Sequence, residues 1–208
     1  MTQINIPITS FIKFAFSQNG LARTKCVREI KQQIEQQYNP HFDYWKKLRE
    51  SIVKLHKGTI SIEEFHSIPL QIPEESKRRN YLIAVNNYIR LIKNKNVEYF
   101  ETGKSYWNYR DELLVNSSPT IGLYIDKVPH LIRLAPRKSK DREDKRRVFT
   151  ALTLMSESQK NYVPPTDSIN AILNPVKSKL YLESPHNDDL LIALESDAAA
   201  FCATWQRV

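Results

Sequence analysis

The 208 residues are 41% hydrophobic and 26% charged, a composition typical of a folded protein that buries a substantial core. No run of about 18 apolar residues occurs, so we expect no membrane span. The N-terminal residues 1–10 lack the basic and apolar segments of a secretory signal. Cys26 and Cys202 lie in helical patterns outside any C-x-x-C pair. We therefore expect buried thiols and a reducing, cytoplasmic location, and a single disulfide between them stays open.

The net charge of +8 is unevenly distributed along the chain. Residues 1–147 hold 27 lysines and arginines against 16 acids, whereas residues 148–208 hold 4 against 7. This asymmetry favours a polyanionic partner for the first 147 residues, because clustered cations attract phosphates over long distances.

The first hundred residues have helical periodicity. Gly20 is expected to end the first helix in a left-handed turn, and Gly58 to end the third. A capping signal at Ser61 precedes a short helix. The strongest pattern is that of residues 74–93, because its apolar residues recur every three or four positions without interruption. The other predicted helices cover residues 11–18, 21–37 and 41–57.

Periodicity then changes from helical to alternating. Residues 121–125 and 128–134 form a predicted hairpin about Asp126 and Lys127, although Pro129 argues for an edge strand or a later strand start. With residues 113–115, these runs predict a three-stranded antiparallel meander. A helix over 140–158 capped by Ser139, a fourth strand over 180–182 and a last helix after Ser184 complete the chain.

The predicted fold class is therefore α+β, with a helical N-terminal half followed by a small, mainly antiparallel sheet on which helices pack. A boundary near residue 100 would separate a helical region 1–100 from an α+β region 101–208. The whole chain 1–208 as one domain is the alternative.

The segment between residues 133 and 147 is densely basic. Its cations can neutralise several phosphates, and the nearby Tyr106, Trp107 and Tyr109 can stack on bases if they are exposed. Interspersed acids favour a simpler alternative, a solvated helix start with i,i+4 ion pairs. The predicted phosphate contacts in this segment are Arg133, Arg137, Lys138, Lys140, Arg142, Lys145, Arg146 and Arg147.

A second basic cluster, Arg23, Lys25 and Arg28, lies near the start of the helix predicted over 21–37. A helix, a tight turn and a basic second helix can present a recognition helix to the DNA major groove. However, Phe16 stands where such a motif needs a small residue, so an ordinary αα-hairpin is the favoured interpretation.

The predicted order of helix 74–93, three strands, helix 140–158 and strand 180–182 resembles the αβββαβ core of the PD-(D/E)xK nuclease superfamily. The resemblance covers about half the chain and concerns element order only. It implies an acid at the end of the second strand and a Glu-x-Lys on the third, which together hold a divalent metal. Asp126 can be the first acid, but the third strand, residues 130–134, has no carboxylate. A metal site is therefore not predicted.

No P-loop, dinucleotide-binding or G-x-S-x-G motif occurs, and the five histidines are scattered. We predict a nucleic-acid-binding protein without catalysis or a cofactor of its own. A protein-interaction subunit or homo-oligomer is the alternative, docking through the apolar stripe of the last helix or the face from Tyr81 to Ile92. A divergent nuclease with a displaced acid is the second alternative.

Overall fold

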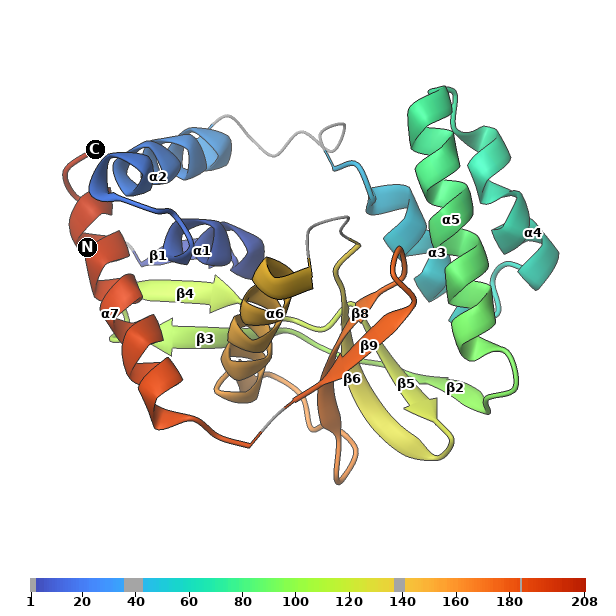
Figure 1. The fold of residues 1–208 in the computed structure, drawn as a ribbon. Helices are drawn as coiled ribbons and strands as arrows, with labels where there is room; N and C mark the ends of the chain where they lie inside the picture. The colour runs from blue at the N-terminus through green and yellow to red at the C-terminus, as the bar shows by residue number, and fades with distance from the viewer. Residues whose placement is uncertain (1–2, 36–42, 137–140, 184) are drawn as a thin grey trace.

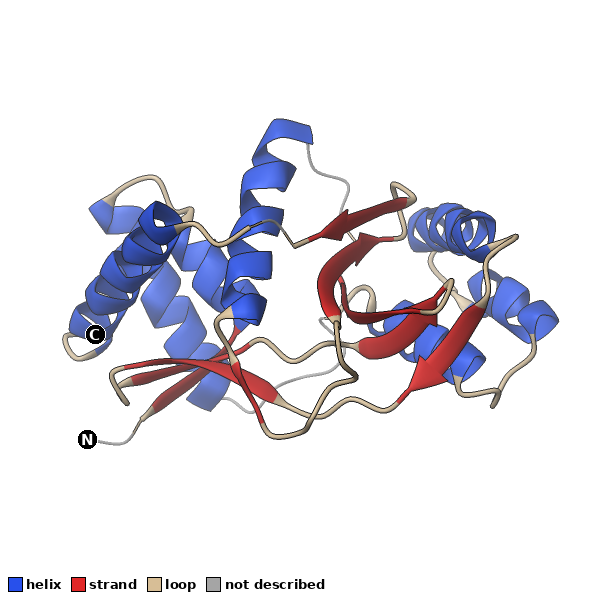
Figure 2. Ribbon diagram, turned by 90° about the horizontal axis from the view of Figure 1, so that it is seen from below, coloured by secondary structure: helices blue, strands red, loops and turns tan. Residues whose placement is uncertain are grey.

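Two mixed β-sheets, each with its own apolar core, organise the chain (Figure 1). The computed structural model describes residues 3–35, 43–136, 141–183 and 185–208, and of residues 141–144 only the backbone. Figure 2 shows the two sheets with helices packed beside each. The α+β class predicted from sequence is confirmed.

The first sheet has four strands in the order β1-β4-β3-β7. β3 (Ser105–Tyr109) and β4 (Leu113–Asn116) form an antiparallel hairpin, and β1 (Ile4–Pro7) joins it parallel to β4. The short β7 (Gln159–Lys160) pairs with the other edge of β3. The first core joins this sheet to four helices: α1 (Ile8–Ala15), α2 (Gly20–Glu35), α6 (Asp141–Ser156) and α7 (Asp188–Trp205).

The second sheet has five strands in the order β2-β5-β6-β8-β9. β6 and β8 are parallel and the other neighbours are antiparallel. One face packs against α3 (Lys46–His56), α4 (Ile62–Ser67), the 3₁₀ helix η2 (Ile68–Gln71) and α5 (Glu75–Ile92). The strands are β2 (Val97–Phe100), β5 (Ile121–Ile125), β6 (Val128–Leu134), β8 (Ile169–Asn174) and β9 (Lys179–Leu182).

The structure confirms three predictions that rest on one or two residues each: a helix cap, a helix end and a hairpin turn. Ser61 and Glu64 form a reciprocal capping box at the start of α4, and Gly58 has a φ of +69° after α3. Asp126 and Lys127 form the turn between β5 and β6 with φ values of +52° and +72°. Positive φ at both turn positions suits the right-handed twist of a hairpin, even without glycine.

The predicted meander is wrong in its first strand. Residues 113–115 belong to β4 in the first sheet, and β2 takes their place beside β5. β6 is also a central strand rather than an edge strand. Its pairing with β8 begins at His130, so Pro129 lies outside that pairing and removes no donor from it. The predicted strand 180–182 is β9, which pairs with the unpredicted β8.

Several helix ends also differ from the predictions. α1 begins at Ile8, and Gly20 opens α2 rather than ending the preceding helix with a positive φ. α7 is capped by Asn187, whose side chain accepts a hydrogen bond from the Leu190 amide at 2.9 Å. Ser139 and Ser184, the predicted caps of α6 and α7, lie outside the described residues. The boundary near residue 100, between a helical region 1–100 and an α+β region 101–208, stays a prediction, as does the alternative of one domain 1–208.

Candidate phosphate-binding site

The eight predicted cations between residues 133 and 147 lie in different environments. Arg133 is on the central strand β6 and is half-buried. On α6, Lys145 and Arg146 are exposed and Arg147 is half-buried. Arg137, Lys138 and Lys140 lie outside the described residues, as does the side chain of Arg142. The segment is therefore not one continuous exposed strip.

Cations from α6 and α2 meet at the C-terminal end of α1. The guanidiniums of Arg146 and Arg147 lie 5.7 and 4.9 Å from the centre of the Phe16 ring, and that of Arg23 lies 5.1 Å from the Phe14 ring. Such contacts hold cations on aromatic faces with modest energies. Two basic segments separated by more than a hundred positions thus converge on one helix end. We use the name basic cluster for the exposed cations of the two helices that pack on α1, Lys25 and Arg28 on α2 and Lys145 and Arg146 on α6.

Arg23 has a structural partner and is not part of the basic cluster. Its Nη2 donates to Oδ1 of Asp197 on α7 at 2.8 Å. Burial raises the pKa of Asp197, and the charge and hydrogen bond of Arg23 oppose that shift. The pair therefore ties α2 to α7. Lys25 and Arg28, three positions apart and exposed, lie together on α2 away from its buried side.

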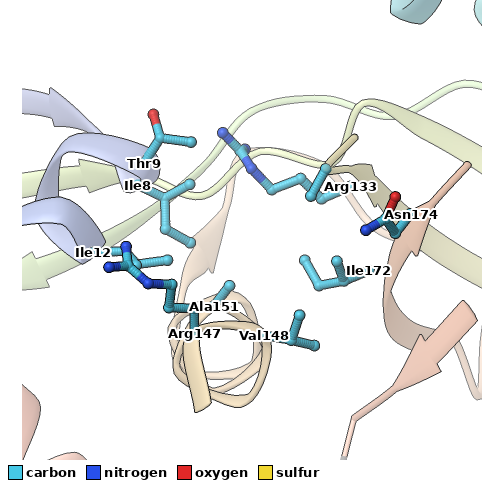
Figure 3. A pocket seen from close by; sticks show the side chains of 10 residues that line it. Ile8, Thr9, Ile12, Arg133, Arg147, Val148, Ala151, Ile172 and Asn174 are labelled. Carbon is cyan, nitrogen blue, oxygen red and sulfur yellow. The ribbon is translucent and has the colours of Figure 1, made fainter. Parts of the chain in front are cut away.

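Arg133 lines a cavity of about 40 Å³ between α1, β6, α6 and β8. Figure 3 shows its side chain extending toward Thr9, with Arg147 beside Ile12 and Asn174 on the opposite side. The polar lining comes from Thr9, Arg133, Arg147 and Asn174. Isoleucine, valine and alanine side chains form the rest. The cavity is therefore mostly apolar with two arginines at its boundary.

The charge of Arg133 is only partly compensated. Its Nη1 donates to the Ser118 carbonyl oxygen at 2.8 Å. Burial, and secondly the positive charge of Arg49 on α3, lower the pKa of Arg133 to about 10. The guanidinium still carries its proton at neutral pH, so a half-buried cation lies here that another cation repels.

A second, open hollow lies beside α3 and contains Arg49. Arg49 is paired with Asp43, and Lys46, Lys54 and Thr120 also line this hollow. Thr120 is next to β5 and only two positions after Ser118, which accepts the hydrogen bond of Arg133. The hollow at α3, which also contains the acids Asp43 and Glu50, and the Arg133 cavity therefore adjoin the same connecting segment.

The aromatic run after residue 105 is not a stacking surface. Trp107 and Tyr109 are buried in the first core, and the Trp107 ring lies 5.6 Å from that of Phe11. These rings hold β3 against α1, so they are not accessible to bases. Tyr106 points to the other face of the strand and is half-buried.

Asp126, the candidate nuclease acid, is exposed in the β5–β6 turn. Its Oδ1 accepts a hydrogen bond from the Asn96 amide at 3.0 Å, which joins the turn to the chain before β2. Within residues 3–35, 43–136, 141–183 and 185–208, no group of three or more His, Cys, Asp or Glu residues could hold a metal ion. The structure thus assigns Asp126 a turn-stabilising contact.

Both helix faces predicted to dock on another chain are used internally. Tyr81, Val85 and Tyr88 of α5 are buried in the second core, and Leu194 and Phe201 of α7 in the first. A protein partner would need a different surface. Among the described helices, none is long and apolar enough to cross a membrane.

Sequence reasoning missed two contributors to the candidate site, Arg49 and Asn174. Asn174 ends β8, whose uninterrupted buried run is a signal for a central strand. The residues that line the cavity with Asn174 come from distant segments of the chain, so the sequence does not indicate the site.

No protein-family model matches the chain, and no curated protein matches it either. The site is therefore defined by geometry alone.

Proposed function

We propose that this protein binds nucleic acid through phosphate contacts made by the basic cluster and catalyses no reaction on it. The proposal is supported by the packing of both α2 and α6 against α1, and by the contacts of Arg146 and Arg147 with Phe16 at the end of α1. An exposed group of lysines and arginines attracts a polyanion and releases its condensed counterions on binding. The net charge of +8 supports the same partner class.

The test compares the salt dependence of duplex binding in the parent and in a variant with four neutralised cations. Glutamine is the replacement because it keeps helix propensity while removing charge. The binding variant carries Lys25→Gln, Arg28→Gln, Lys145→Gln and Arg146→Gln. A control variant carries four exposed changes on and after α5: Arg79→Gln, Arg90→Gln, Lys93→Gln and Lys95→Gln.

Binding of a mixed-sequence duplex by the parent should weaken steeply as salt rises. The slope of log affinity against log salt should flatten by up to about 0.9 for each phosphate contact that the binding variant loses. The control should keep the parental slope. Equal slopes in the parent and in the binding variant would remove the basic cluster as the contact surface.

The absence of catalysis is tested separately. Supercoiled plasmid should stay intact with Mg²⁺ or Mn²⁺, whereas cleavage that Asp126→Asn abolishes would establish the nuclease alternative. A stable oligomer in light scattering, together with no nucleic-acid affinity, would establish the protein-interaction alternative. We also propose a cytoplasmic location, which the buried free thiols Cys26 and Cys202 support.

A further inference from the structure

An exposed aromatic ring lies on α6 beside two cations of the basic cluster. The side chain of Phe149 is 39% exposed, whereas its chain neighbours Val148 and Thr150 are buried. Among the described side chains, no other ring and no cation contacts the Phe149 ring. The rings of Trp107 and Tyr109, which were predicted to stack on bases, are buried on β3. Phe149 is therefore the better candidate for a stacking residue.

The helical spacing places Phe149 next to cations. Lys145 precedes it by four positions and Arg146 by three, so the three side chains are neighbours on one surface of α6. Both cations are exposed, and the guanidinium of Arg146 lies 5.7 Å from the centre of the Phe16 ring. Single exposed apolar side chains are common on protein surfaces. Phe149 differs from such residues because the exposed side chains one turn before it are positively charged.

We propose that the nucleic acid bound by the basic cluster is single-stranded, with one base stacked on Phe149 while Lys145 and Arg146 contact the adjoining phosphates. The inference rests on the proposed function and names the type of strand. Sites that bind single strands without sequence preference combine cations along the backbone with aromatic rings on which the bases stack. This combination of groups is present on the exposed surface of α6.

A duplex does not offer the same contact. Each base face in a duplex is covered by the neighbouring bases of the stack, and a helix in the major groove meets base edges instead. Reaching a base face would require the base to leave the stack, which costs a few kcal/mol. An unpaired base offers its face at much lower cost, so a ring on the side of α6 favours single strands.

The test compares four ligands at one salt concentration: a mixed-sequence DNA strand, the same strand with abasic sites, its duplex, and an RNA strand of the same sequence. The parent should bind the DNA strand or the RNA strand more tightly than the duplex, and the RNA strand distinguishes these two sources of unpaired bases. Abasic sites should weaken binding of the DNA strand about tenfold, because they leave the phosphates and remove the stacked base.

Substitutions of Phe149 identify the ring as the cause. Phe149→Ala should lower the affinity for the single strand about tenfold and leave the duplex affinity and the salt slope unchanged, because no charge is lost. Phe149→Leu keeps an apolar side chain without a ring, so it should show the same loss and keeps the test decisive if Phe149→Ala does not fold. Phe149→Trp should retain the preference. Leu70→Ala, at a 78% exposed position on η2, is the matched control and should also retain it.

The outcomes separate this inference from the proposed function. Equal affinity of the parent for strand and duplex, or a single-strand affinity unchanged in both Phe149→Ala and Phe149→Leu, would overturn the stacking proposal. A salt slope that still flattens in the binding variant would then leave the proposed function intact. Binding to anionic phospholipid vesicles that requires Phe149, together with no preference for single strands, would assign the ring to a lipid surface instead.

Discussion

The pair of His56 and Tyr88 makes stability depend on pH between about 4 and 6.5. Nε2 of His56 lies 2.6 Å from the hydroxyl of Tyr88, whose ring is fully buried in the second core. Burial lowers the pKa of His56 from 6.5 to about 4. The unfolded chain therefore binds a proton at a higher pH than the folded protein. The contribution of His56 to the free energy of unfolding is fully present above pH 6.5 and is lost as the pH falls toward 4.

The size of this loss follows from the shift of the His56 pKa. At about 1.36 kcal/mol for each pKa unit, the full shift corresponds to about 3 kcal/mol, and about 2 kcal/mol is lost by pH 5. The assay is urea unfolding at pH 7.5 and pH 5 of the parent and of His56→Gln, which keeps an amide beside the Tyr88 hydroxyl. His66→Gln changes an exposed histidine on α4 and is the matched control.

Between the two pH values, the parent and the control should lose about 2 kcal/mol more stability than His56→Gln. Carboxylates titrate equally in all three proteins, so the comparison isolates the histidine. An equal loss in His56→Gln and the parent would show that His56 is not buried in its neutral form, and would refute the reasoning.

Three further substitutions test the packing, each measured by urea unfolding. Gly122→Ala should destabilise the second sheet by about 1–3 kcal/mol, because the added Cβ would lie 2.4 Å from a ring carbon of Phe100, and Gly122→Ser should cost at least as much. Ser117→Ala should cost about 1–3 kcal/mol, since it removes the hydroxyl that donates to the buried Ser158 Oγ at 2.6 Å, and an unchanged stability would contradict this. Phe201→Ala should cost about 3–5 kcal/mol by leaving a cavity in the first core, whereas Phe201→Leu should cost less.

Elements with strong local patterns were predictable. α5 and α7 follow uninterrupted helical spacing, and the β5–β6 hairpin needs only a two-residue turn. The missed strands lack such patterns. β8 is buried on both faces and does not alternate, while β1 and β7 have four and two residues. Their partners lie far along the chain, as in the parallel pair of Ile4 and Leu113, and no local signal specifies such a pairing.

The candidate site was predictable only in part. The basic composition around residue 140 identified Lys145 and Arg146 as exposed cations, and the structure has them so. Arg133 was grouped with them, but it lies on a central strand between the apolar residues Ile132 and Leu134, a context that indicates burial. The contact of Arg146 with Phe16 had no signal in the sequence, because tertiary packing alone brings α6 against α1.

The placement of α7 in the first core has a consequence for synthesis on the ribosome. Phe14 of α1 packs edge-on against Phe201, with ring centres 5.1 Å apart, and β1 pairs with a strand near residue 115. The N-terminal helix therefore emerges long before α6 and α7, two of the helices that pack on it, have been made. The second sheet and α3–α5 are complete once residue 182 has been made. Nascent chains that end before α7 should expose Phe14 to chaperones, which makes the surroundings of α1 among the last to become native.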